Sequence, residues 1–435
     1  MNKNLSLFLL FICDILVITF SIFMAVCLKN MLYGDEIFQN IFRYINFIPL
    51  YAIMILLFFH YGIYTRRYDF WHESHMVIKS SFLGFLLTLS FLALEKANYS
   101  YSRTVFVFSF IFMMIFLPST KFILKRWLFK VGIWRKRARI IGESREFELE
   151  LFTNHYLGYV RAKGKEYESI FIGGSRLSSD NLNELIEQNI KENKEILFSP
   201  ILQSYDFSKA YIYNIFNSRT NVFAIQNSLK SKFNMASKRA LDIFLILLSM
   251  PLLVPIFVII MLAVKISEPK GSIFFSQPRL GLNGKIFSCY KFRSMCADQS
   301  FMNEWLEQNP DETEYYKIFK RYKNDPRITK IGKFLRKTSL DELPQLINVL
   351  KGDMSIVGPR PYLPAESVDF EDKIDLVLAV RPGITGIWQV SGRSDVDFAT
   401  RAQMDTWYMK NWSVWNDIVI IIKTFKVVLV REGAS

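Results

Sequence analysis

The sequence has 435 residues and a formal charge of +14, yet 51% of its residues are hydrophobic and 40 are Phe. A positive mean hydropathy beside 22% charged residues excludes a single soluble domain and indicates membrane segments joined to soluble ones. The four cysteines have no CxxC spacing and only four histidines are present, which argues against a disulfide scaffold or a zinc site.

Four apolar segments are long enough to cross a hydrocarbon core of about 30 Å, which takes roughly 20 residues. They are residues 5–28, 45–64, 76–94 and 104–124. The first loop is acidic, whereas the second loop and the segment after the fourth span are basic, so both ends of this bundle are expected in the cytoplasm. Asp14 lies about two turns into the first span, which favours a packing or interfacial role over a functional one.

Residues 131–230 predict a small soluble α/β domain. Short apolar runs such as SIFIGG and EILF alternate with polar helical stretches such as 179–194, as strands and helices do in a layered fold. A dinucleotide fingerprint needs three glycines after the first strand, and the turn here, IGESREF at 141–147, has one. We therefore expect a Rossmann-like domain with a degenerate nucleotide site.

A fifth apolar run, 243–264, follows Lys238 and Arg239 and contains Pro251 and Pro255 near its middle. Each proline removes a backbone N–H and disturbs the preceding turn. A broken helix can enter and leave a bilayer by one face, and the positive charge on both flanks favours this re-entrant hairpin, over 238–265, against a kinked crossing helix.

Two adjacent acids, Asp341 and Glu342, stand in KTSLDELPQL at 337–346. Ser339 with Glu342 matches a capping box, but Pro344 favours Asp341 itself as the cap of a helix over 343–350. An ionised aspartate at a helix start beside a phosphate can also attack phosphorus. Because two anions repel each other, this chemistry implies Mg²⁺, with Asp341 and Glu342 as its ligands.

Basic residues set beside glycine or proline follow the fifth apolar run. Such turns present guanidinium groups to a polyanion, because the planar fork binds phosphate through two hydrogen bonds. For Lys333, Arg336 and Lys337, a basic surface facing the membrane is at least as good an interpretation. The arginines in turns are Arg279, Arg360, Arg381 and Arg393.

These motifs together resemble the bacterial sugar transferases that act on polyprenyl phosphate, the monotopic phosphoglycosyl transferases. Four N-terminal spans before an α/β domain resemble the larger, WbaP-type polyprenyl-phosphate hexose-1-phosphate transferases. The segments that carry the resemblance are KRALD (238–242), RLGLNGKIFSCYKFRSM (279–295), DPRITKIGKFLRKTSLDELPQL (325–346), KGDMSIVGPRP (351–361), RPGITGIWQVSGR (381–393) and WYMKNWSVWNDIVIIIKT (407–424).

The resemblance implies that Asp341 is the nucleophile and Glu342 its metal-binding neighbour. It implies that Lys238 and Arg239 lie near the lipid phosphate and that Pro255 breaks the re-entrant helix, with Pro251 sharing that task. Residues implied to line the nucleotide-sugar and phosphate site are Lys291, Arg293, Arg360, Arg381 and Arg393.

The fold class predicted is a membrane α/β protein. A four-span domain would occupy 1–130, the degenerate Rossmann-like domain 131–230, and a mainly helical phosphoglycosyl transferase domain with the re-entrant helix 231–435. Aromatic residues near the end, among them Tyr408 and Trp412, followed by an apolar stretch, suggest a helix anchored at the membrane interface.

The function predicted is transfer of a sugar 1-phosphate from a UDP-sugar to undecaprenyl phosphate, with release of UMP, at the cytoplasmic face of a bacterial inner membrane. This reaction would initiate synthesis of a surface polysaccharide. The segment RPYL at 360–363 resembles enzymes that transfer galactose or glucose. The bilayer is an expected partner, a homodimer is possible and no nucleic acid is expected. The alternatives are a membrane-bound nucleotide-sugar dehydratase or epimerase and a non-catalytic scaffold of polysaccharide assembly.

Overall fold

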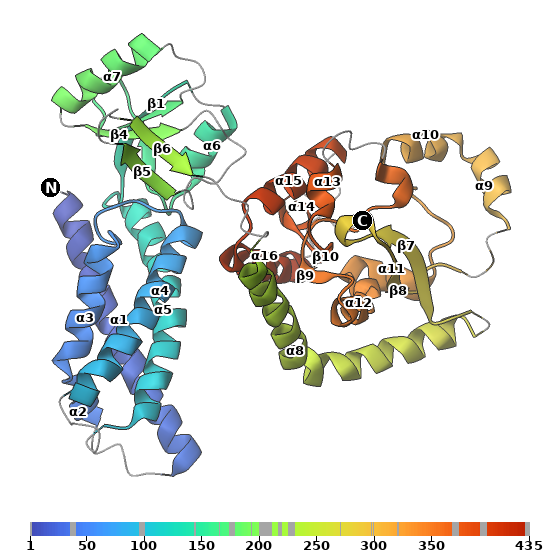
Figure 1. Cartoon of the computed structure of the whole chain (residues 1–435), viewed down its shortest axis with the longest axis horizontal. Coiled ribbons are helices and arrows are strands. Elements are labelled where there is room, and N and C mark those ends of the chain that lie inside the picture. The colour runs from blue at the N-terminus through green and yellow to red at the C-terminus, as the bar shows by residue number, and fades with distance from the viewer. Residues whose placement is uncertain are drawn as a thin grey trace. The chain divides into compact units, whose positions relative to one another are not determined.

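The structure, a computed structural model, forms two compact units, Met1–Leu202 and Gln203–Ser435, and each is described by itself (Figure 1). The predicted domain over 1–130 lies within the first unit, whereas the predicted domain over 131–230 continues past the end of that unit at Leu202. The residues described are 2–34, 41–94, 101–142, 145–164, 166–173, 179–192, 194–199, 211–215, 220–224, 231–269, 271–296, 298, 300–319, 322–367, 374–391 and 398–430.

The first unit begins with a bundle of long apolar helices. The predicted spans are confirmed as helices long and apolar enough to cross a membrane, the second of them made of two helices in succession. The bundle core is rich in aromatic side chains that pack edge to face. Its helices are α1 (Asn2–Tyr33), α2 (Ile41–Ile45), α3 (Ile48–His60), α4 (Phe70–Leu94) and α5 (Arg103–Val131).

Two ion pairs are buried inside this bundle. Lys121 Nζ of α5 lies 2.6 Å from Asp14 Oδ2 of α1, and the Tyr64 hydroxyl donates to the same oxygen at 2.8 Å. One turn further along α5, Lys125 pairs with Glu73 of α4. The expectation that Asp14 has a packing role agrees with this geometry, because the carboxylate ties α1 to α5 in a closed interior.

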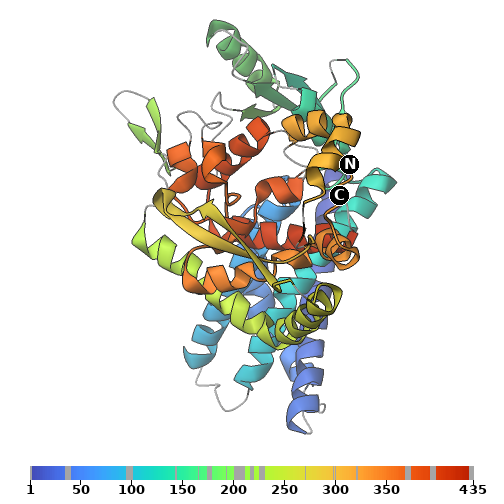
Figure 2. The same cartoon turned by 90° about the vertical axis from the view of Figure 1, so that its right-hand side faces the viewer.

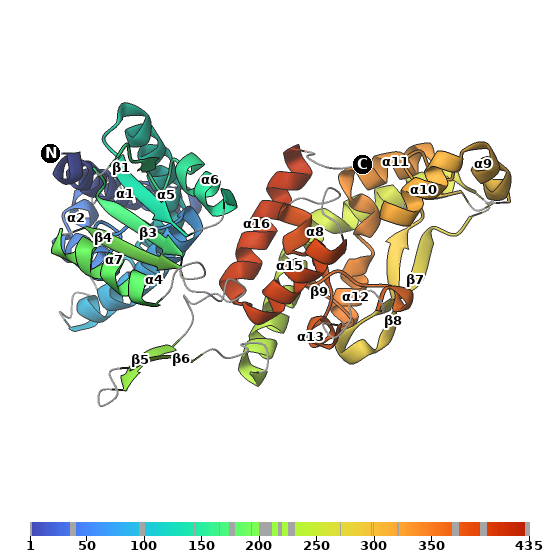
Figure 3. The same ribbon diagram turned by 90° about the horizontal axis from the view of Figure 1, so that it is seen from above.

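A parallel sheet follows the bundle, in the order β2-β1-β3-β4, and α7 packs against it (Figure 3). The α/β layer predicted from alternating runs is confirmed for this part of the chain. Its elements are β1 (Lys136–Ile141), α6 (Arg145–Thr153), β2 (Tyr159–Arg161), β3 (Ser169–Gly173), α7 (Ser179–Lys191) and β4 (Glu195–Ser199).

Residues 220–224 also form a strand, but it does not join this sheet. It forms β6 (Thr220–Ala224), which pairs antiparallel with β5 (Tyr211–Ile215) in a separate hairpin. Both strands belong to the second unit, so alternation of apolar runs identified the strand correctly and its sheet wrongly.

The second unit is mainly helical around a few short strands. A long antiparallel hairpin, β7 with β8, crosses it (Figure 2), and β9 pairs parallel with β10. Its further elements are α8 (Lys232–Ser267), β7 (Phe274–Leu280), η7 (Leu282–Gly284), β8 (Ile286–Phe292), α9 (Met302–Gln308), α10 (Pro310–Phe319), α11 (Lys330–Thr338), η8 (Leu340–Glu342), α12 (Gln345–Lys351), β9 (Ser355–Val357), α13 (Ile374–Leu378), β10 (Gly383–Thr385), α14 (Ile387–Ser391), α15 (Phe398–Lys410) and α16 (Val414–Val430).

Helix α8 is one 36-residue helix that runs through both Pro251 and Pro255. It bends near its middle (Figure 1), the part of its sequence that contains the prolines, because each proline loses a helix hydrogen bond and pushes away the carbonyl four residues earlier. The prolines therefore bend the helix without ending it, and the predicted re-entry into one face of the bilayer stays a prediction.

Both halves of α8 pack against the same unit. Ile246 in the first half joins a buried cluster with Val349, and Ile260 in the second half joins one with Leu335. The apolar side chains around the bend are instead exposed, and include Leu247, Leu248, Met250, Leu252, Val254, Val258 and Ile259. The helix therefore leaves the domain surface, exposes apolar residues and returns to the same domain.

The aromatic residues near the C-terminus are part of the core. Tyr408 of α15 and Trp412 are 1% and 2% exposed, and both donate hydrogen bonds to the Asp417 carboxylate of α16. The predicted interfacial anchor is therefore wrong for these two residues, because a buried carboxylate attracts their polar atoms inward.

Candidate active site

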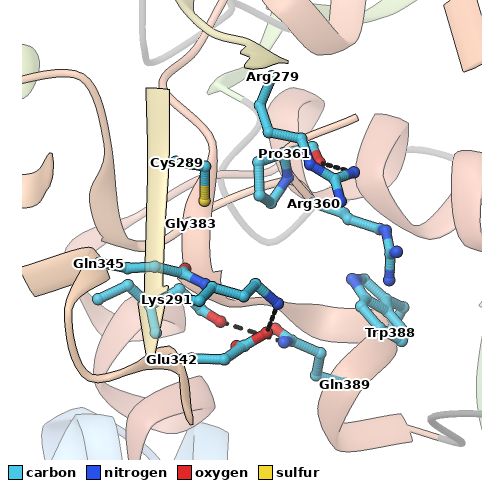
Figure 4. Close-up of a pocket in the computed structure, with 11 residues that line it drawn as sticks. Arg279, Cys289, Lys291, Glu342, Gln345, Arg360, Pro361, Gly383, Trp388 and Gln389 are labelled. Carbon is cyan, nitrogen blue, oxygen red and sulfur yellow. Dashed lines mark hydrogen bonds and ion pairs between the residues drawn. The ribbon is translucent and has the colours of Figure 1, made fainter. Parts of the chain in front are cut away.

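A lysine and a glutamate face each other where β8 approaches η8. Lys291 Nζ of β8 lies 2.6 Å from Glu342 Oε1, and Figure 4 shows the two side chains pointing toward one another. Their side chains remain 30% and 27% exposed, so the pair is open to a cleft. Asp341, the neighbour of Glu342, is 9% exposed.

The η8 turn is held between two helices. Thr329 caps the start of α11, because its hydroxyl accepts a hydrogen bond from Gly332 N, and Ser339 caps the end of α11 in the left-handed region with φ 56°. Such a conformation is uncommon outside glycine and asparagine, and it redirects the chain into the short 3₁₀ turn that carries Asp341 and Glu342. Both acids are thus presented on a turn fixed at each end.

The predicted cap of the next helix is wrong. Helix α12 begins at Gln345 with Pro344 before it, and no side-chain hydrogen bond caps either α12 or η8. The 3₁₀ turn ahead of Pro344 delays the helix start, and the Glu342 side chain turns toward Lys291 and away from the backbone. Gly352 ends α12 at φ 92°.

The two acids have opposite pKa shifts. Burial, and then the charge of Glu342, raise the pKa of Asp341, although Lys291 and Arg336 oppose this shift. Burial also disfavours ionisation of Glu342, but Lys291, followed by Arg360 and Arg279, lowers the pKa of Glu342 below its ordinary value. Glu342 is therefore held ionised beside an aspartate whose charge a cation would favour.

A cleft opens beside this pair. It combines three cationic side chains with one carboxylate and two amides, a set suited to a ligand that carries phosphates and hydroxyl groups. Its lining residues are Arg279, Cys289, Lys291, Glu342, Gln345, Arg360, Pro361, Gly383, Ile384, Trp388 and Gln389.

Arg360 reaches this cleft through support that the sequence did not reveal. Its guanidinium lies 5.4 Å from the centre of the Trp388 ring (Figure 4), and its backbone N–H donates to Asp405 Oδ2 at 3.1 Å. The same oxygen accepts the Tyr362 hydroxyl at 2.6 Å. Tyr362 of the RPYL segment is therefore a buried support of the Arg360 loop, and neither it nor Asp405 lines the cleft.

Trp388 is a second residue that sequence reasoning missed. Its indole Nε1 is buried and finds no acceptor in the part of the chain that the structure describes, although the residue lines the cleft. A buried donor without an acceptor costs free energy, and a ligand oxygen would supply the missing acceptor. Its position in the motif GIWQVSGR was the only signal available.

Lys238 and Arg239 bind the protein itself. Lys238 Nζ donates to Val357 O, the Tyr408 hydroxyl and Asp417 Oδ2, which uses all three of its N–H groups. Arg239 donates to the last carbonyls of α12, including Leu350 O at 2.9 Å, a favourable place for a cation. All three N–H groups of Lys238 thus have partners within the protein, and a place of Lys238 and Arg239 near the lipid phosphate stays a prediction.

Arg381 and Arg293 are not among the described residues that line the cleft. Arg381 Nε donates to Gly352 O at 2.7 Å, and Arg293 donates to the Ser272 hydroxyl at 3.1 Å. Arg393 lies outside the described residues. Of the predicted basic residues, the structure brings Lys291 and Arg360 to the acid pair, together with Arg279, which the sequence had singled out as an arginine beside a proline.

Asp341 and Glu342 are the candidate ligands for Mg²⁺. Within the described ranges no group of three or more His, Cys, Asp or Glu residues could hold a metal. Two adjacent carboxylates nevertheless fit this ion, because Mg²⁺ is commonly held by one or two carboxylates and completed by water and substrate phosphates. Asp341 and Glu342 would be the protein ligands.

A membrane protein with an acid pair beside a cationic cleft belongs, by fold and site, to the class of enzymes that handle phosphate esters at a membrane. The model of the family "Bacterial sugar transferase" matches residues 233–431. The chain is 35% identical to the undecaprenyl-phosphate galactose phosphotransferase of Salmonella typhimurium, over 85% of this chain and 84% of that protein. This chain belongs to the bacterial sugar transferase family.

Other relatives extend over most of the chain as well. The UDP-galactose-lipid carrier transferase of Erwinia amylovora is 34% identical, with 85% of each chain covered. A UDP-glucose:undecaprenyl-phosphate glucose-1-phosphate transferase of Klebsiella pneumoniae is 30% identical over 94% of this chain and 92% of that protein. The family predicted from the motifs is confirmed, and it supersedes the dehydratase, epimerase and scaffold alternatives.

Proposed function

We propose that this protein transfers a hexose 1-phosphate, galactose or glucose, from a UDP-hexose to undecaprenyl phosphate. The products are undecaprenyl-diphosphate-hexose and UMP, and the reaction initiates synthesis of a surface polysaccharide. The observation that carries this proposal is a cleft with three cationic side chains and Glu342, whose neighbour in the sequence is the largely buried Asp341. The names of the relatives supply the two substrates and the hexose class.

The chemistry divides into two displacements at one phosphorus atom. The Asp341 carboxylate attacks the phosphate next to the sugar, the bond from that phosphorus to the UMP oxygen breaks, and UMP leaves. An oxygen of undecaprenyl phosphate then attacks the same phosphorus, and the Asp341 carboxylate is released. Mg²⁺, when bound to the acid pair, neutralises charge on the transferring phosphate.

The cationic residues have separate tasks in this proposal. Lys291 keeps Glu342 ionised and close to the acid turn. Arg279 of β7 and Arg360 of the loop after β9 also line the cleft. Their planar guanidinium groups suit the diphosphate of the UDP-hexose. Stabilisation of developing charge by such preorganised groups supplies a large part of the rate of phosphoryl transfer.

We infer further that α8 is a re-entrant membrane helix and that the active site lies at the cytoplasmic surface. A straight helix of 36 residues would span about 54 Å, well beyond a hydrocarbon core of about 30 Å. Contacts of both halves with one domain support re-entry, since a crossing helix would carry one half away from that domain. UDP-sugars are cytoplasmic, which gives the orientation. The predicted homodimer stays a prediction.

UMP release tests the reaction. The purified protein is incubated with a panel of UDP-sugars, and undecaprenyl phosphate and Mg²⁺ are each supplied or omitted. We expect continuous UMP release from UDP-galactose or UDP-glucose only when both are present, and loss of at least about 100-fold when a chelator removes the cation. Absence of UMP release from every UDP-sugar, or turnover that survives chelation, would overturn the proposal or its metal, respectively.

A further inference from the structure

A stripe of exposed lysines runs along helix α11. Lys330, Lys333 and Lys337 are all exposed, and their spacing of three and four residues places them on one face of the helix. Phe334 lies between them and is 58% exposed. We call these four residues the α11 stripe.

No acid balances this stripe. The helix sequence KIGKFLRKT contains no carboxylate, and none of the three lysines forms an ion pair within the residues that the structure describes. The fourth basic residue, Arg336, is directed elsewhere, because its Nε donates to the Ser294 hydroxyl at 2.9 Å. The stripe is therefore an uncompensated cationic surface with an aromatic ring in its middle.

The opposite face of α11 attaches it to the apolar helix α8. Leu335 and Ile331 join the buried cluster that contains Ile260 and Val264 of α8. The neighbouring α8 side chains Ile259, Leu262 and Ile266 are 65%, 59% and 78% exposed. Such a row of exposed apolar residues requires a non-aqueous surrounding, so α11 is fixed beside the part of the protein that enters the bilayer.

We propose that the α11 stripe binds the anionic headgroups of the bilayer. Lysine side chains beside a membrane-inserted element extend toward the headgroups, and each lysine near an anionic surface contributes about fivefold to membrane affinity. An exposed aromatic ring among them fits the interface, where such rings are enriched. Zwitterionic lipids carry no net charge, so the partner is an anionic lipid surface.

The position of α11 gives this contact a consequence for catalysis. The helix ends at Thr338, and the turn with Asp341 follows directly. The α11 backbone is also locked in place, because a Cβ on Gly332 would meet Ser294 O at 1.9 Å. Binding of headgroups along α11 therefore holds the acid turn at the membrane surface, where the phosphate of the lipid acceptor lies.

The test uses the full chain in nanodiscs of phosphatidylcholine, with or without about 30% phosphatidylglycerol. Wild-type protein should show a KM for undecaprenyl phosphate at least about fivefold lower with the anionic lipid. The variant K330E/K333E/K337E should lose this dependence, and its KM for UDP-hexose should stay unchanged. A control, K163E/K191E/K285E, changes the net charge equally at exposed lysines elsewhere and should behave as wild type.

Native mass spectrometry adds a readout without activity: wild type and the control should retain more phosphatidylglycerol than the stripe variant. Equal retention, or an unchanged lipid dependence in the stripe variant, would overturn the proposal. A KM for undecaprenyl phosphate that rises equally in both bilayers would overturn it as well and assign the stripe to the acceptor. Wild-type UMP release tests the proposed reaction separately.

Discussion

The ion pairs inside the helix bundle of the first unit and the ion pair at the cleft of the second unit differ in their exposure to solvent. In the first, the pairs Asp14–Lys121 and Glu73–Lys125 have side chains about 1% exposed. In the second, the Lys291–Glu342 pair is 30% and 27% exposed and faces a cleft. A closed pair can only hold helices together, whereas an open pair can meet a phosphate and a cation. Solvent exposure therefore separates the Lys291–Glu342 pair at the cleft from the structural pairs in the bundle.

The largest effect is expected at the open site. Asp341→Asn should lower UMP release by about 10⁴-fold or more, because an amide cannot replace the carboxylate as nucleophile, while the protein still folds in membranes. Asp375→Asn, at an exposed carboxylate in the first turn of α13, is the matched control and should keep wild-type turnover. Appreciable activity of Asp341→Asn would remove Asp341 as the nucleophile.

The closed pairs should control stability. Lys125→Met leaves the Glu73 carboxylate buried without its cation, which should cost about 3–5 kcal/mol of unfolding free energy. Unfolding of the detergent-solubilised protein measures this loss. The double variant Lys125→Met, Glu73→Met should recover most of it, and the folded fraction should release UMP at the wild-type rate. A single variant as stable as wild type would contradict the comparison.

Asp405 of the second unit is a third kind of acid: a buried carboxylate with no ion pair among the described residues. Burial raises the pKa of Asp405 to about 6, against hydrogen bonds from Tyr362 and Arg360 N. The folded protein then binds a proton that the unfolded chain has released, so stability should fall as pH rises from about 4 to about 6.

Asp405→Asn should remove this pH-dependent part of the free energy of unfolding, about 3 kcal/mol, because the amide oxygen still accepts both hydrogen bonds and does not titrate. Thermal unfolding of wild type and variant across this pH range measures the difference between the two slopes. Identical pH profiles for the two proteins would show that the carboxylate titrates normally.

Lys291→Met should have the opposite effect to Lys125→Met: it should lower turnover and leave the free energy of unfolding nearly unchanged. The pair is about one-third exposed, and solvent-screened pairs contribute only about 0–1 kcal/mol to stability. Turnover should fall by about 100-fold, because Glu342 loses the charge that holds it ionised and oriented. Steady-state UMP release and unfolding are measured on the same preparation. A large stability loss with normal turnover would place this pair with the closed ones.

The smallest effect is expected at Trp388. Trp388→Phe keeps the ring beside Arg360 but removes the unpartnered indole N–H, so KM for UDP-hexose should rise by about tenfold with little change in kcat. Trp305→Phe, in α9 and not among the cleft residues, serves as the control. An unchanged KM would show that no oxygen of UDP-hexose accepts a hydrogen bond from this N–H.

Local patterns predicted the elements well. The apolar runs gave the membrane helices, and alternation gave β1, β3 and β4. The capping prediction at Asp341 was wrong because a 3₁₀ turn before Pro344 and the pull of Lys291 outweighed the local preference. Helix α8 differed in degree, since its prolines bend it without ending it.

Residues with distant partners were beyond sequence reasoning. Lys238 donates to Asp417, which is 179 residues away in the sequence. The sequence alone therefore could not show that this lysine binds within the protein. Asp405 accepts a hydrogen bond from the backbone N–H of Arg360, 45 residues before it, and no sequence motif links the two residues. Periodicity and turn chemistry act over a few residues, so they could identify the acid pair and the arginine turns but could not assemble the cleft.

The central claim is that Asp341 forms a covalent intermediate. The most direct measurement mixes the protein with UDP-hexose and Mg²⁺ without undecaprenyl phosphate, follows UMP, and maps the adduct by mass spectrometry after quenching in acid. We expect a burst of one UMP per active site and a hexose phosphate on the peptide that contains Asp341. No burst without the lipid acceptor, or an adduct on another residue, would contradict it.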